Sequence, residues 1–317
     1  MISNFSEVEK SLKRCLKEKV SITAATVVGF LIAGTVAFGG TTTDVEFTTT
    51  TSGQVTVDGT PIDDTNESIS VDQYLELVDT TSQPAGTLAT LLTVTTENGV
   101  TTFAGIGDLG IVKATATTNG KLTLIKTDAA HTSITSKLTI EAKGDSTSSN
   151  EGTAMSADGE GHTVTNDGTI DVKEYAVGMS AKNGGTAVNN ADTDESGNGI
   201  TVDAGNGAEA STAIGMVASG IGETEKSTAT NKGKITVTKG IGMMAEAGAE
   251  AINEAAKDFT VKDADSVGML ATGEGSIATN KGTITVNNGT GMLAKDGENI
   301  CTTEDVVQRR IDNDLGT

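Results

Sequence analysis

Large apolar side chains are scarce in this sequence. Of its 317 residues none is Trp, six are Phe and two are Tyr, while 39 are Gly. This leaves little material for a conventional globular core. The composition fits either a disordered polar chain or a repetitive β-structure that buries small aliphatic residues layer by layer. A regular repeat in the second half of the chain favours the β-structure.

Cysteine and arginine are also rare. The two cysteines, Cys15 and Cys301, lie near opposite ends, so removal of the N-terminal segment would leave no pair for an intramolecular disulfide. This low count is typical of exported bacterial surface proteins. No Arg occurs between Arg14 and Arg309, which excludes bidentate guanidinium recognition of phosphate or carboxylate by the body of the protein.

Positive charge is confined to the start of the chain. Residues 1–20 contain five basic and three acidic side chains, so they carry a net charge of +2, whereas the whole chain carries −21. Residues 21–317 therefore carry −23. An acidic body of this kind repels nucleic acid and anionic membranes, so neither is expected as a partner.

Three short motifs recur in a fixed order. The first is apolar-Gly-Met-x-Ala, the second is a small residue followed by x-Asn, and the third is Ile-x-Val. Successive Met residues from a shortened copy at Met155 onward are 24, 37, 27, 26 and 23 residues apart. The repeat Met residues are Met179, Met216, Met243, Met269 and Met292, the Asn residues are Asn166, Asn189, Asn231, Asn253 and Asn280, and the Ile-x-Val copies begin at Ile170, Ile200, Ile235, Phe259 and Ile284.

This period predicts an all-β fold, a three-sided parallel β-helix with about 24–27 residues per coil and one motif on each side. Extra residues at 191–199 and 203–212 fall between motifs, so they are expected to form corner loops. About six coils over residues 150–295 would stack into a rod of roughly 30 Å.

The two-residue period of a strand predicts which side chains face inward. In the copy at 267–271 these are Val267, Met269 and Ala271. Flexible Met fills gaps between coils, and Gly is expected to supply the backbone conformations of corners. By the same alternation, the Asn of the second motif is predicted to face inward. Burial of its amide is unfavourable unless stacked amides hydrogen-bond to one another and to the turn backbone. The five repeat Asn residues are therefore predicted to form a buried ladder.

Four segments follow from these patterns. Residues 1–39 are interpreted as an extended signal peptide, 40–149 as a β-rich N-terminal passenger or cap region, 150–295 as the repetitive β-helix, and 296–317 as a tail that is either a cap or a sign of truncation. NGKLTL at 119–124 echoes the NKGKITV of the third motif, which predicts that the helix extends back into 40–149. Residues 72–80 are expected to form a helix or a capping element.

Residues 20–39 form an uncharged run preceded by basic residues, as in a secretory signal peptide. Small residues at Ala37 and Gly39 place a cleavage site before Gly40. An uncleaved membrane anchor is the alternative, because about 20 apolar residues span a bilayer. Before the run, Phe5, Val8, Leu12 and Leu16 recur at helical spacing and predict a short amphipathic segment.

The basic helix followed by the apolar run resembles the extended N-terminal segment of fusobacterial-type autotransporter adhesins, which are type V secreted proteins. The repeats are similar to autotransporter passenger domains. The resemblance implies an exported passenger without enzymatic activity that acts as a surface adhesin or structural stalk. The implied partners are the secretion machinery and a receptor on host cells or other bacteria. Membrane contact would be limited to the signal segment or to a C-terminal barrel.

Such a barrel would consist of strands with alternating apolar positions, and DGENICTTEDVVQRRIDNDLGT at 296–317 does not have that pattern. A truncated gene product is therefore expected, located at the cell surface if the full gene encodes the barrel and otherwise periplasmic or secreted. The alternatives are a polysaccharide lyase or hydrolase on the same scaffold and a trimeric autotransporter head.

No catalytic, cofactor or metal site is predicted. Gly105–Gly110 spells GxGxxG, but Thr-rich strand sequence follows, so a turn between strands is expected rather than a dinucleotide site. Acidic residues at Asp63–Asp64 and Asp192–Glu195 match no calcium-loop spacing and are interpreted as solvated loops. His131 and His162 are the only histidines, and each is expected to be isolated and solvent-facing.

Overall fold

The computed structural model describes residues 42–49, 55–58, 60–61, 68–78, 91–116, 121–144, 151–191, 198–205, 212–220, 226–255, 258–295 and 299–302. All of them belong to one compact unit, Thr41–Thr317. The predicted signal segment, its cleavage site near Ala37 and Gly39, and Cys15 lie outside the described residues.

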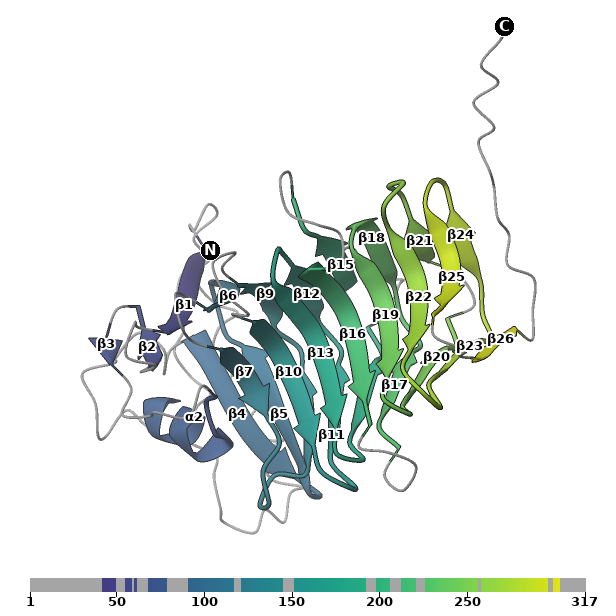
Figure 1. The fold of residues 1–317 in the computed structure, drawn as a ribbon. Helices are drawn as coiled ribbons and strands as arrows, with labels where there is room; N and C mark the ends of the chain where they lie inside the picture. The colour runs from purple at the N-terminus through teal and green to yellow at the C-terminus, as the bar shows by residue number, and fades with distance from the viewer. Residues whose placement is uncertain are drawn as a thin grey trace, which may run out of the picture. The chain divides into compact units, whose positions relative to one another are not determined.

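The chain winds through three parallel sheets, taking one strand from each sheet per coil (Figure 1). From β5 onward each sheet therefore collects every third strand. Sheet B contains β7 (Leu122–Lys126), β10 (Gly152–Asp158), β13 (Ala176–Lys182), β16 (Ala213–Ser219), β19 (Ile241–Glu246), β22 (Val267–Thr272) and β25 (Thr290–Ala294).

Sheet C follows sheet B in each coil. It contains β4 (Leu92–Glu97), β5 (Val100–Gly105), β8 (Ser133–Ser136), β11 (Thr163–Asn166), β14 (Thr186–Asn189), β17 (Thr228–Asn231), β20 (Glu250–Asn253), β23 (Ile277–Asn280) and β26 (Asn299–Thr302).

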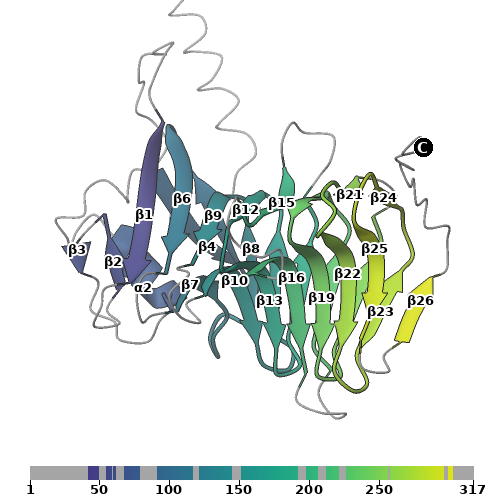
Figure 2. The same cartoon turned by 45° about the horizontal axis from the view of Figure 1, so that its top comes forward.

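Sheet A completes each coil, and its strands can be followed in sequence along one side in Figure 2. It contains β1 (Thr43–Thr49), β2 (Val55–Val57), β3 (Thr60–Pro61), β6 (Leu109–Thr115), β9 (Thr139–Lys143), β12 (Thr169–Val172), β15 (Gly199–Asp203), β18 (Ile235–Lys239), β21 (Phe259–Val261) and β24 (Ile284–Val286). The predicted parallel β-helix is confirmed, and each sequence motif occupies its own sheet.

The repeat Met residues form one column through sheet B. Each Met from Met155 to Met292 pairs in register with the Met of the adjacent coil. Met179, Met216, Met243 and Met269 are fully buried beside an equally buried Ala column. The Ile and Val side chains of sheet A complete this core, so small and unbranched residues fill the narrow interior coil by coil.

The glycine of the first motif has a different role from the predicted one. A Cβ on Gly215 would lie 2.6 Å from the carbonyl oxygen of Gly242 and 3.0 Å from Val202 Cγ2. Gly178, Gly242 and Gly268 are equally crowded, and none of the four has a positive φ. This glycine is therefore required for space between neighbouring coils and not for an unusual backbone conformation.

The predicted inward orientation of Val267 is also wrong. Val267 is partly exposed and lies outside the core cluster, whereas Met269 and Ala271 are fully buried within it. A Cβ on Gly268 would approach Val261 and Ile284, so both Gly268 and Met269 face the core. The alternation of sides is interrupted between these two residues, which places the first residue of the motif on the outer face.

The repeat Asn residues form a second column, in sheet C, and all five are fully buried. Each side-chain amide nitrogen donates to the amide oxygen one coil further on: Asn166 to Asn189 at 2.9 Å, Asn189 to Asn231 at 2.8 Å, Asn231 to Asn253 at 2.9 Å and Asn253 to Asn280 at 2.7 Å. Turn backbone groups add further bonds, such as Gly168 N–H donating to Asn166 Oδ1 at 3.1 Å.

Helix α2 (Val71–Val78) and the antiparallel pair β4–β5 close the N-terminal end of the β-helix. Tyr74 of α2 is buried, donates from its hydroxyl to the carbonyl oxygen of Leu124 at 2.7 Å, and contacts the rings of Phe47 and Phe103. The helix predicted within 72–80 is confirmed at the positions that the structure describes. Three of the five aromatic residues that the structure describes therefore pack at the end of the β-helix, where no further coil covers the core.

The β-helix does extend into the N-terminal region, but the sequence echo assigned one strand to the wrong sheet. Ile125 of β7 pairs with Met155, so Leu122–Lys126 belongs to the Met-bearing sheet B. The third-motif position is occupied by β9, where Ile140 pairs with Ile170. Alternating apolar residues are compatible with a strand in any of the three sheets. The Gly and Met that identify a sheet B strand are missing from this coil, so the sequence did not assign the strand correctly.

Candidate functional site

The outer face of sheet B carries two columns of apolar side chains, one on each side of the Gly-Met pair. Neither column belongs to the core cluster. Several members are nonetheless little exposed, with 5% for Val217 and 6% for both Ile241 and Leu270, which indicates close contact between neighbouring side chains. The columns, called the sheet B face from here on, consist of Val177, Ile214, Ile241, Val267, Val217, Met244, Leu270 and Leu293.

The corresponding outward positions of sheet A are polar. Between the Ile and Val of its motif lie Asp171, Thr201, Thr236, Thr260 and Thr285. Sheet C has mostly Thr at its outward positions, with Val188, Glu250, Ile252 and Ile277 as exceptions. The chain carries a net charge of −21, and its surface needs no apolar stripe to be soluble in water. Contiguous apolar patches on an exposed face mark interaction surfaces.

The sheet B face becomes polar toward the N-terminal coils. In the Val217 column the preceding residues are Ser180, Ser156 and Lys126. Ser180 Oγ is buried and has no hydrogen-bond partner among the residues that the structure describes, an uncommon state for a hydroxyl group. The apolar part of the face therefore spans the coils from β13 to β25.

An ionic cluster lies beside this polar end, where sheet B turns into sheet C. Lys126 Nζ is 3.0 Å from Asp158 Oδ2, and Asn183 Nδ2 donates to Asp158 Oδ1 at 2.6 Å. Partial burial opposes ionisation of Asp158, but these hydrogen bonds outweigh it and hold the pKa of the carboxyl below its ordinary value. Asp158 is thus a fixed negative charge at neutral pH.

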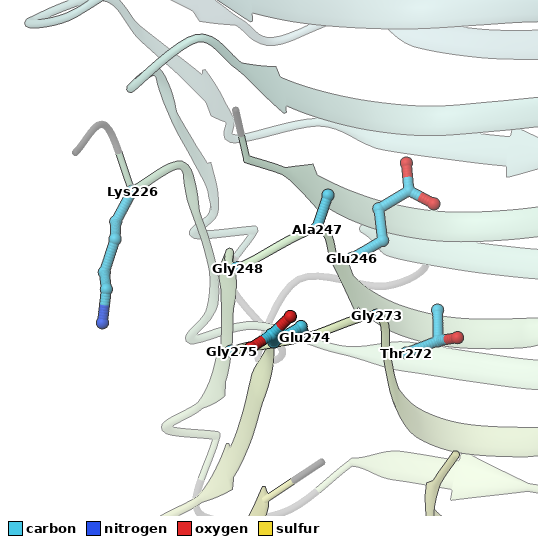
Figure 3. A pocket seen from close by; sticks show the side chains of 8 residues that line it. All are labelled: Lys226, Glu246, Ala247, Gly248, Thr272, Gly273, Glu274 and Gly275. Atoms are coloured by element: carbon cyan, nitrogen blue, oxygen red, sulfur yellow. The ribbon is translucent and has the colours of Figure 1, made fainter. Parts of the chain in front are cut away.

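A pocket of about 920 Å³ lies along the same corner, four coils further on (Figure 3). It lies over the turns after β19 and β22, and its charged lining groups are Lys226, Glu246 and Glu274. Figure 3 shows Lys226 on one side of these turns and Glu246 and Thr272 on the other. The Ser219 hydroxyl donates to Glu246. The lining offers ionic and polar contacts.

One pocket residue has an unfavourable backbone conformation. Ala247 and Gly248 have φ values of 52° and 84°, and in an equivalent corner turn Asn183 and Gly184 have 51° and 81°. Asn tolerates this left-handed conformation better than Ala, for which it costs about 1–2 kcal/mol.

We expect Ala247→Asn to raise the free energy of unfolding by about 1 kcal/mol, measured by urea denaturation. Ala247→Ser is the matched control, since Ser gains little in this conformation. Equal stability of the Asn and Ser variants would contradict the conformational explanation.

Both histidines have polar partners, which corrects the prediction that they are isolated. His131 Nδ1 is 3.1 Å from Asp128 Oδ1, and its side chain is only 12% exposed. His162 Nδ1 lies 2.9 Å from Thr127 Oγ1. Both pairs stabilise corners in the first coils.

The remaining sequence candidates are turns or lie outside the described ranges. Gly105–Gly110 spans the end of β5, a two-residue turn and the start of β6, as predicted for a turn between strands. The acidic segments at Asp63–Asp64 and Asp192–Glu195 fall among residues that the structure does not describe, and the Cys301 side chain is likewise not described.

Within the described ranges there is no group of three or more His, Cys, Asp or Glu side chains placed to hold a metal ion. Helix α2 is too short to cross a bilayer, and the described residues include no longer apolar helix.

Comparison with known proteins finds a match to a family model in the second half of the chain. Residues 174–256 and 208–304 match the family model described as the BigA third pectate lyase-like domain. The two overlapping matches cover the coils from β13 to β26, which include the apolar part of the sheet B face. No curated protein and no solved structure matches the chain.

Proposed function

We propose that this chain is an exported passenger that acts as a surface adhesin or structural stalk, and that the sheet B face is its contact surface. The observation that carries the proposal is the apolar stripe on one outer side of an otherwise polar and acidic β-helix. The match to a domain of BigA, a bacterial surface protein of autotransporter-like type, supports an exported location.

The chemistry of the face suits a protein receptor on a host cell or another bacterium. Its aliphatic and Met side chains bury apolar surface without requiring a charged partner. Sugar recognition commonly uses exposed aromatic rings, whereas of the five aromatic residues that the structure describes four are buried and Tyr175 is partly exposed. The acidic remainder of the surface limits non-specific association, so binding is confined to the uncharged stripe.

The proposal is tested by making this face resemble sheet A. We expect the triple variant Val217→Thr, Met244→Thr and Leu270→Thr to bind host cells or bacteria at least about tenfold more weakly, because three apolar contacts of roughly 0.5 kcal/mol or more each are lost. Binding of labelled purified protein to cell monolayers gives the measurement, and circular dichroism verifies the β-helix.

The matched control changes three outward residues of sheet A in the same coils, Thr236→Ser, Thr260→Ser and Thr285→Ser, and should bind as the parent does. Undiminished binding by the sheet B variant would exclude this face as the contact surface.

A polysaccharide lyase is the second candidate, because the matched model is described as pectate lyase-like. Its test is incubation of the purified protein with pectate and measurement of unsaturated sugar products by ultraviolet absorbance. Product formation above that of a heat-denatured sample would replace the adhesin proposal with an enzymatic one.

A further inference from the structure

Asn288 and Gly289 occupy the corner between β24 and β25. Gly289 has φ +99°, and a Cβ there would lie 2.4 Å from the carbonyl oxygen of Asp263 and 2.7 Å from that of Ser266. Only glycine fits this position. Asn288 is exposed, so its side chain and the following backbone nitrogen are reached by water.

The side chain of Asn288 lies against that nitrogen. Gly289 N–H donates to Asn288 Oδ1 at 3.1 Å. Because Oδ1 is bonded to Cγ, the contact also brings the nitrogen of Gly289 close to the carbonyl carbon. With no side chain on Gly289, nothing shields the nitrogen from that carbon. These are the two atoms that must join for a five-membered succinimide ring to form.

We propose that Asn288 is a site of spontaneous deamidation in the folded protein. Gly289 N loses its proton to water and forms a bond with Asn288 Cγ, while the bond from Cγ to Nδ2 breaks and Nδ2 leaves as ammonia. Water then opens the ring at either carbonyl and gives aspartate or isoaspartate. The net change is one water consumed and one ammonia released, without any oxidant or reductant.

Three other Asn-Gly pairs lie in the described residues. Asn98 and Gly99 form the exposed turn between β4 and β5, and the other two pairs are held differently from Asn288. Asn183 donates to Asp158 Oδ1 at 2.6 Å, and the nitrogen of Gly184 donates to Ser227 Oγ at 3.1 Å. At Asn198, the nitrogen of Gly199 donates to the carbonyl oxygen of Gly168 at 3.0 Å. In both pairs the attacking nitrogen is engaged elsewhere, so folding protects them and leaves Asn288 reactive.

The product would alter the coil boundary. Aspartate adds a negative charge to a chain that already carries −21. Isoaspartate adds a methylene to the backbone at a corner where Gly289 lies tightly against the preceding coil. Pairing of β25 with β22 is therefore expected to weaken in the modified fraction.

The test is peptide mapping of the purified full chain after incubation at mildly alkaline pH. Trypsin releases residues 282–295, which contain Asn288, and mass spectrometry measures conversion of amide to acid. We expect Asn288 to convert at least about tenfold faster than Asn183 and Asn198, since each protected pair must first break one or more hydrogen bonds.

Protein unfolded in urea is the control for intrinsic reactivity, and there the three sites should convert at similar rates. Asn288→Gln keeps the amide but disfavours the five-membered ring, so it should abolish conversion of the 282–295 peptide. Conversion of Asn288 in the folded chain no faster than that of Asn183 and Asn198 would overturn the proposal.

Discussion

Replacement of Asn231 by Ala is expected to lower the free energy of unfolding by about 2–5 kcal/mol, because two buried amide hydrogen bonds are lost and both partners remain in the core. Asn231 accepts from Asn189 at 2.8 Å and donates to Asn253 at 2.9 Å, and all three side chains are fully buried. The position cannot relax toward water, since coils lie on both sides of it. Urea denaturation followed by circular dichroism provides the measurement.

Asn190 supplies the matched control for this variant. It belongs to the preceding coil and follows Asn189 directly, but its side chain is exposed and donates to Asp167 Oδ1 at 3.1 Å. Asn190→Ala should cost less than about 0.5 kcal/mol, as is usual for a surface polar contact. Similar losses for the two variants would mean that the ladder contributes little to stability.

Truncation of Met243 to Ala should destabilise the protein by about 2–5 kcal/mol through lost apolar burial and a cavity in the core. Met243 is fully buried and lies in register between Met216 and Met269, so two neighbouring coils lose contacts at once. The cavity closes poorly because the backbones on either side are fixed in the sheet.

Met244 is the next residue along the chain and the control for this prediction. It faces outward and is only partly buried, so Met244→Ala should cost about 1 kcal/mol or less. Thermal unfolding of the two variants measures the stability lost at each position. The two methionines are adjacent in the chain and lie on opposite sides of the same strand. A larger loss for Met244 than for Met243 would contradict the assignment of the inner face.

The repeat spacing was sufficient to predict the three-sided β-helix and the sheet that each motif occupies. The prediction succeeded because Met and Asn are distinctive residues that recur at the same place in each coil and so mark one column each. The prediction failed for Val267, which was assigned to the inner face by strict alternation along the strand. Val267 lies on the outer face because Gly268 and Met269 both face the core. A strict two-residue period cannot reveal such an interruption.

The candidate contact surface was not found from the sequence for the same reason. The two-residue period that predicts an inward Val267 predicts the same for its counterparts Val177, Ile214 and Ile241, so it does not reveal this column as part of an outer face. The sequence does contain one sign of this apolar face, at the position between Met and Ala of the first motif. The residue there changes along the chain from Ser180 to Val217, Met244, Leu270 and Leu293. An apolar residue at a position predicted to face outward was visible without the structure.

The direction of the Asn ladder has a consequence for how the rod assembles. The side-chain amides of Asn166, Asn189, Asn231 and Asn253 all donate toward the C-terminal end, so their dipoles align along the axis and each of these coils presents an N–H group to the next. Since the aromatic cap closes the N-terminal end, folding is expected to nucleate there and to propagate coil by coil. A rod of this kind has a direction of growth, and a defect in one coil divides it into two cooperative units that melt separately.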